Sequence, residues 1–132
     1  TVVRQEATLF HDSLRNNLTM YRSVPESKIL LVLRSVGLER FANSQALDNV
    51  VTEGGSNFSG GEKKRICLAR ALLRDTDVLI LDEPLANLDA TTAERIEDVL
   101  LSIQNKTILI VSHQFTETKL AHFDQVVDFA VS

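Results

Sequence analysis

The chain has 132 residues, of which 44% are hydrophobic and 24% are charged, and its formal net charge is -4 at pH 7. These values are typical of one soluble globular domain that is long enough to bury a core. The net negative charge argues against a broad nucleic-acid footprint, which needs clustered positive charge, so no nucleic-acid partner is expected. The one basic cluster, Lys63-Lys64-Arg65, is expected to be a solvated face of a helix.

The sequence lacks the features of a membrane-spanning protein and of a secreted one. No apolar run approaches the roughly 18 residues of a membrane span, and no signal peptide is visible. Any membrane role is therefore expected to come through a partner or another segment. The single cysteine, Cys67, has no second cysteine to pair with, which fits a reducing compartment. Its apolar neighbours predict a small core residue rather than a reactive thiol.

The first part of the chain predicts structure rather than chemistry. Residues 1–4 are expected to form the end of a strand, and residues 24–48 to be helical in two pieces. Pro25 suits an early helix position, an apolar stripe at helical spacing follows it, and Gly37 is a natural stop. A second short helix is expected from 39 to 47, and core packing explains both stripes.

The next segment has the features of a helix start that could hold an anion. Ser59 is a good N-cap, and Glu62, three residues later, completes a capping box. Gly60 and Gly61 lie between them and leave backbone N–H groups open to a ligand. A helix N-terminus with free amides and a favourable dipole is a ready phosphate site. The helix is expected to run from about 60 to 74.

An apolar strand with an acidic end follows this helix. Residues 78–81 are four consecutive aliphatic residues, which suits a strand buried on both faces of a parallel sheet. Asp82 and Glu83 end the strand. Ligands in open α/β sheets bind beyond the carboxyl ends of the strands, where this acidic pair is expected to lie. The alternative is that the two carboxylates only cap a helix.

The last third of the chain continues to alternate helix and strand. A helix is expected from Thr91 or Thr92 to about 103, a strand at 107–111, a short helix at 116–122 and a final strand at 125–131. His113 follows the strand at 107–111 after one residue, Ser112, and is either a functional residue at this edge or a structural one at a strand end. Because the aliphatic strand at 78–81 suits a parallel sheet, we expect an α/β fold, a mostly parallel sheet with flanking helices.

In order and spacing, these stretches resemble the motifs of ABC-type ATPases. Residues 58–62, Phe-Ser-Gly-Gly-Glu, are similar to the signature motif of that family, and residues 78–83 to its Walker B strand with the catalytic glutamate. Residues 86–89 resemble the D-loop and His113 the switch histidine. Gln5, after the first strand, stands where the family has the glutamine of the Q-loop.

The resemblance implies an ATPase that uses ATP and Mg²⁺. Glu83 would orient or deprotonate the attacking water, with His113 and Gln5 as further catalytic residues, and Asp82 and Gln5 would hold the metal. The implied nucleotide-binding residues, which face a second subunit, are Ser59, Gly60, Gly61, Glu62 and Asp89. Glu62 stands where the family usually has glutamine and adds negative charge near the site.

The resemblance extends to a subclass. Residues 9–18, Leu-Phe, a short spacer, then Ser-Leu-Arg-Asn-Asn-Leu, are similar to exporter-type members, and Glu53 lies at the distance of their acidic loop. An exporter implies a head-to-tail dimer with a second nucleotide-binding domain, a transmembrane domain as partner and a place at the cytoplasmic face of the cell membrane. In that family the membrane domains determine the transported substrate, so these residues do not identify it.

One family motif is absent. A P-loop would read G-x-x-x-x-G-K-[ST], and no such stretch occurs among these residues. Since this loop precedes the Q-loop in the family, the chain is expected to be the C-terminal part of a nucleotide-binding domain. It would be a partial P-loop NTPase fold, without the P-loop strand and inactive by itself.

The expected parts are a Q-loop region (1–10), an α-helical subdomain with the signature (11–75) and the remaining core (76–132). Without the P-loop strand, residues 126–129 are expected to pair directly with 107–111, to pair with another molecule or to be displaced.

Two other functions stay open at this point. A soluble ABC-type ATPase of DNA repair or translation would act on nucleic acid; coiled-coil insertions or basic tails would favour it, and neither is present. A non-catalytic interaction module would be favoured if the natural gene also lacks a P-loop.

Overall fold

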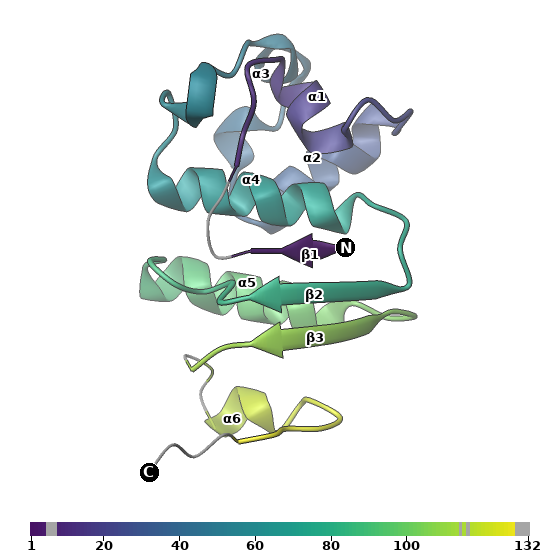
Figure 1. The fold of residues 1–132 in the computed structure, drawn as a ribbon, viewed down its shortest axis with the longest axis vertical. Coiled ribbons are helices and arrows are strands. Elements are labelled where there is room, and N and C mark those ends of the chain that lie inside the picture. Colours follow the sequence, from purple (N-terminus) through teal and green to yellow (C-terminus); the bar gives the residue numbers. More distant parts are fainter. Residues whose placement is uncertain (5–7, 114, 116, 129–132) are drawn as a thin grey trace.

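The computed structural model describes residues 1–4, 8–113, 115 and 117–128. Figure 1 shows a small parallel sheet, a layer of helices beyond its β1 edge, and a further helix behind the sheet. The strands are β1 (Val2–Val3), β2 (Val78–Asp82) and β3 (Thr107–Val111). The helices are α1 (Leu14–Thr19), α2 (Glu26–Ser35), α3 (Ser44–Asp48), α4 (Gly60–Leu72), α5 (Ala90–Ser102) and α6 (Glu117–Leu120), with short 3-10 turns η1 (Glu39–Phe41) and η2 (Glu53–Gly55).

All three strands are parallel and lie in the order β1-β2-β3. Val2 is opposite Ile80, and Asp82 at the end of β2 is opposite Val111 at the end of β3. The carboxyl ends of the strands therefore meet at one edge of the sheet, the left edge in Figure 1, where α4 and α5 begin. This arrangement confirms the expected α/β class with a parallel sheet.

The burial of β2 differs from the expectation of a strand covered on both faces. Leu79 and Leu81 are 1% and 0% exposed and belong to the same buried cluster as Ile96 of α5. Val78, on the other hand, is 46% exposed. The expectation was wrong because α5 covers one face of the described sheet, while the residues that alternate with Leu79 and Leu81 are left half-buried or exposed.

Helix α4 lies between the sheet and the other helices of the upper layer in Figure 1, along β1. Its inward face carries Ile66 and Ala69, both 0% exposed, which join Leu14, Leu18 and Leu33 in the core. Cys67 is 8% exposed, so the expected core cysteine is confirmed, and burial raises the pKa of its thiol.

The C-terminal end of α2 is held by two arginines from other helices. Gly37 has φ +81°, and the amide of Leu38 donates to the carbonyl of Leu33, 2.9 Å away, which closes the helix end. The Arg65 guanidinium of α4 donates to the carbonyl of Gly37 at 2.8 Å, and Arg95 of α5 donates to the carbonyl of Arg34. The expected stop at Gly37 is confirmed, and Arg65 is part of an interhelical contact rather than of a solvated face.

Several element boundaries differ from the sequence-based expectation. The helical stretch at 24–48 is α2, η1 and α3, because the chain leaves the helix at Gly37 and again near Asn43, the N-cap of α3. Helix α1 was not expected; Ser13 caps it by accepting from the amide of Asn16 at 3.0 Å. None of the described helices is long and apolar enough to cross a membrane.

The expected final strand is absent from its described part. Residues 125–128 form no strand, and Val126 and Val127 are 52% and 62% exposed. A strand needs a neighbour for its ladder hydrogen bonds, and β3 pairs only with β2 among the described residues. Of the three expected outcomes, direct pairing with 107–111 is excluded for residues 126–128, while pairing with another molecule and displacement stay predictions; Phe129 lies outside the described residues.

Candidate nucleotide-binding and catalytic site

The start of α4 has the geometry that the sequence predicts. The Ser59 hydroxyl accepts from the amide of Glu62 at 3.1 Å, and the Glu62 carboxylate accepts from the amide of Ser59 at 2.9 Å, which completes the capping box. A Cβ built on Gly60 would have no heavy atom within 4 Å, so the space beside this residue is open. The amides of Gly60 and Gly61 have no acceptor within the helix, because they lie in its first turn.

Glu62 has a second partner that the sequence did not reveal. The Arg40 guanidinium of η1 lies 2.8 Å from the second carboxylate oxygen of Glu62 and 4.4 Å from the centre of the Phe41 ring. Phe41 in turn packs edge-on against Phe58, with 5.2 Å between the ring centres. Both oxygens of Glu62 are thus used within the chain, and Arg40 balances the negative charge that this glutamate adds.

The acidic pair lies at the carboxyl end of β2. The amide of Glu83 donates to the carbonyl of Val111 at 2.8 Å, which extends the β2–β3 ladder by one residue. Glu83 has φ +49°, a left-handed conformation that is uncommon outside glycine. Strained residues of this kind cluster at functional sites, where the surrounding structure holds them in place.

The structure brings Glu83 and His113 together, although 30 positions separate them. His113 Nδ1 lies 2.8 Å from Glu83 Oε1, because β2 and β3 are neighbours and both residues follow their strands. The Glu83 side chain is 17% exposed and the His113 side chain 77%. The other carboxylate oxygen of Glu83 is buried and has no hydrogen-bond partner among the described residues.

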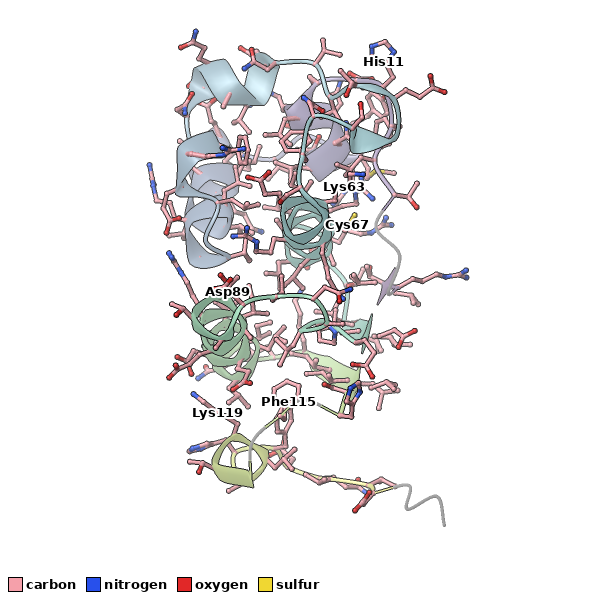
Figure 2. The ribbon with its side chains drawn as sticks, turned by 90° about the vertical axis from the view of Figure 1, so that its left-hand side faces the viewer. His11, Lys63, Cys67, Asp89, Phe115 and Lys119 are labelled. Atoms are coloured by element: carbon pink, nitrogen blue, oxygen red, sulfur yellow. The ribbon has the colours of Figure 1, made fainter. Side chains whose placement is uncertain are left out.

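Beyond Glu83, the chain turns tightly into α5. Asn87 has φ +64°, and Asp89 caps α5 by accepting from the amide of Thr92 at 3.4 Å. The hydrogen bonds from Thr92 hold the pKa of Asp89 below its usual value. Asp89 is exposed at the start of α5 in Figure 2, which views the molecule from the left-hand side of Figure 1.

Lys64 corrects the expectation of a solvated basic face. The residue is only 7% exposed, and its amino group donates to the carbonyl of Ala86 at 3.2 Å. Burial lowers the pKa of Lys64, while the negative charges of Glu83 and Asp82 act in the opposite sense. A sequence signal existed: Lys64 is three and four residues before Cys67 and Leu68, and this spacing places it on the buried face of α4.

Of the residues singled out from the sequence, Glu83 and His113 are in contact, and Asp82 precedes Glu83 at the same strand end. Ser59, Gly60, Gly61 and Glu62 form the start of α4, and Asp89 that of α5. Gln5 lies outside the described residues. The described residues hold no group of three or more acidic, histidine or cysteine side chains placed for a metal ion.

Comparison with known proteins agrees with this arrangement. The sequence profile described as ABC transporter matches residues 1–86, which is more than half of the chain. The chain belongs to the ABC transporter family.

Several ABC proteins illustrate the similarity. The glutathione/L-cysteine transport system ATP-binding/permease protein CydC of Escherichia coli K12 is 39% identical over 129 residues, covering 96% of this chain and 22% of that protein. The ATP-dependent lipid A-core flippase of Haemophilus ducreyi is 35% identical over 133 residues, covering 97% and 23%. The structure of a bacterial Atm1-family ABC exporter with ATP bound superposes with a TM-score of 0.77 at 25% identity, covering 91% of this chain and 22% of that one.

These comparisons confirm the expected fold class, part of an ABC ATPase fold. The chain spans about a fifth of the length of the ABC proteins that it matches.

Proposed function

We propose that this chain is the part of an ATP-hydrolysing domain that carries the signature motif and the catalytic glutamate of an ABC exporter. The contact between Glu83 and His113, 2.8 Å long, carries the proposal. A carboxylate fixed by an imidazole at the carboxyl end of a parallel strand is well placed to act as a general base. The relatives are a transport protein and a flippase by name, which favours export over DNA repair, translation or a non-catalytic role.

Mg²⁺ fits the acidic end of β2. Mg²⁺ is commonly bound by one or two carboxylates together with substrate phosphates, so a set of three protein ligands is not required. Asp82 would hold the ion, with Gln5 as the second proposed ligand. The buried oxygen of Glu83, which has no partner among the described residues, supports a positively charged or hydrogen-bonding group at this strand end. When bound with ATP, the metal would neutralise charge on the phosphates.

The residues of this chain then have distinct roles in phosphoryl transfer, which depends mainly on positioning and charge neutralisation. Glu83 would orient the attacking water and accept its proton. His113 holds one oxygen of Glu83, and since its side chain is 77% exposed, the ring stays accessible to the γ-phosphate. The φ of +49° at Glu83 fixes the direction in which the carboxylate leaves the strand.

The start of α4 would serve a different nucleotide. Ser59 and Gly60 are exposed, and the space beside Gly60 is open. We infer that they bind the γ-phosphate of ATP held by a second nucleotide-binding domain in a head-to-tail dimer, with Gly61 and Glu62 in the same turn and the exposed Asp89 at the interface. A transmembrane domain as partner and a place at the cytoplasmic face of the membrane follow from the exporter assignment.

The decisive experiment uses the full-length protein with Glu83→Gln. The amide keeps the shape of the side chain and removes the base, so turnover should fall by roughly 10²- to 10⁴-fold while ATP binding is retained. Glu94→Gln, at an exposed position of α5, is the matched control and should turn over like the wild type. A Glu83→Gln protein that keeps most of its ATPase rate would exclude Glu83 as the base.

A further inference from the structure

The amino group of Lys64 is an unusual feature of α4. The residue is 7% exposed, whereas lysine is almost never buried without a partner. Its hydrogen bond runs to a backbone carbonyl, that of Ala86, at 3.2 Å. A neutral acceptor alone does not balance a buried ammonium group, so the charge needs acidic neighbours.

Those neighbours are the two carboxylates at the end of β2. Glu83 and Asp82 are the groups whose negative charges favour the protonated form of Lys64 and oppose the lowering of its pKa by burial. Lys64 therefore shares one electrostatic environment with the residues proposed to bind the metal and activate water.

A second contact joins α4 to the same turn. A Cβ built on Gly61 would lie 3.5 Å from Leu88 Cδ2, so the first turn of α4 packs closely against the segment between β2 and α5. That segment is closed by hydrogen bonds from the amide of Ala86 to the carbonyl of Glu83, at 3.2 Å, and from Leu88 to Leu85, at 3.3 Å. Lys64 attaches to the carbonyl in the middle of this turn.

We propose that Lys64 is a positioning residue that fixes the turn after β2 to α4 and places a positive charge beside Asp82 and Glu83. This rests on the proposed function, in which the start of α4 binds the nucleotide of the partner domain while the acidic pair serves the nucleotide of its own domain. Lys64 lies one helical turn from Gly60. It therefore connects the two nucleotide positions within one subunit, through a single side chain.

The test compares Lys64→Met with Lys63→Met in the full-length protein. Both remove one positive charge from adjacent positions of α4, but Lys63 is only half-buried. Lys64→Met leaves the charges of Asp82 and Glu83 without their cation, which is destabilising, so the fold of the variant is checked by circular dichroism before its kinetics are compared. Its kcat should fall roughly 10- to 100-fold with little change in the KM for ATP, because the reacting groups are displaced and nucleotide contacts are kept.

A measurement without nucleotide separates positioning from general stability. In Lys64→Met, amide hydrogen exchange at Ala86 and Leu88 should become faster, while exchange in the rest of α4 and in β2 stays at the wild-type rate. Lys63→Met should match the wild type in both assays. If Lys64→Met does not fold, Lys64→Gln replaces it: its amide can still donate to Ala86, so exchange should be near normal while kcat is reduced.

Wild-type kcat in the folded Lys64 variants, or an equal loss of kcat in Lys63→Met, would overturn the proposal. The Glu83→Gln experiment keeps this outcome apart from a failure of the proposed function. If Glu83→Gln abolishes turnover and the Lys64 variants do not, only the role of Lys64 is wrong.

Discussion

The start of α4 and the carboxyl end of β2 lie at the same edge of the molecule but are built in opposite ways. At the start of α4, the polar groups are paired: the side chains of Ser59 and Glu62 each accept from the backbone amide of the other residue, and Arg40 pairs with the remaining oxygen of Glu62. At the end of β2, Glu83 combines a left-handed backbone with a buried oxygen that has no partner among the described residues.

The difference indicates what each region needs from a ligand. The α4 start offers backbone amides and the Ser59 O–H, which remains a donor while its oxygen accepts from the amide of Glu62, so a phosphate can bind there without rearranging the capping box. The end of β2 holds an unsatisfied acceptor and strain, both of which cost free energy until another group arrives. The start of α4 is therefore a docking point for phosphate, and the end of β2, with Glu83, is a reactive corner that neighbouring residues hold in place.

The largest expected effect tests the reactive corner. His113→Ala in the full-length protein should lower kcat by roughly 10²-fold, because Glu83 loses the partner that orients its carboxylate. His122→Ala, at an exposed position near α6, is the matched control and should leave steady-state ATPase activity unchanged. Equal activity of the two variants would mean that the imidazole contact does not position the base.

A smaller effect tests the docking point. Ser59→Ala removes the N-cap of α4 and should lower the free energy of unfolding by about 0.5–2 kcal/mol. Ser13→Ala removes the N-cap of α1 and is the control, because it should cost a similar amount. Steady-state ATPase assays should show an additional loss of turnover for Ser59→Ala only. If both variants lose stability and neither loses turnover, Ser59 is a structural cap and no phosphate ligand.

The smallest effect tests how well the α4 start is satisfied. In a double-mutant cycle with Arg40→Met and Glu62→Gln, the coupling in the free energy of unfolding should be about 0.2–1 kcal/mol, since Arg40 is 67% exposed and solvent weakens the pair. Denaturant unfolding of the four proteins measures it. A coupling of zero would show that Glu62 needs no cation and that the capping box alone holds its carboxylate.

The sequence predicted those parts of the fold that depend on local pattern. The capping box at Ser59, the stop at Gly37 and the strands β2 and β3 each follow from a few neighbouring residues, and the structure has all of them. The direct contact between Glu83 and His113 was not predicted; it arises because the parallel strands β2 and β3 bring their carboxyl ends together. The resemblance to the ABC family supplied their proposed roles, which the geometry alone does not assign.

The failures involve partners far apart in the sequence. Arg40 and Glu62 are brought together by the packing of η1 against the start of α4, and no local pattern marks that pair. Lys64 was assigned to solvent by its charge, although its helical position placed it inward. The final strand was inferred from residues with high strand propensity. Residues 125–128 nevertheless form no strand, because propensity alone does not supply the neighbouring strand that a ladder of hydrogen bonds requires.

The two arginines that bind the C-terminal end of α2 indicate which positions of this protein tolerate substitution in evolution. Arg65 and Arg95 hold backbone carbonyls, those of Gly37 and Arg34, and a carbonyl is present whatever side chain its residue carries. Substitutions on the outer surface of α2 therefore leave its attachment to α4 and α5 intact. We expect substitutions to be poorly tolerated at the two arginines and at Gly37, where a Cβ would lie 3.1 Å from the Arg65 guanidinium.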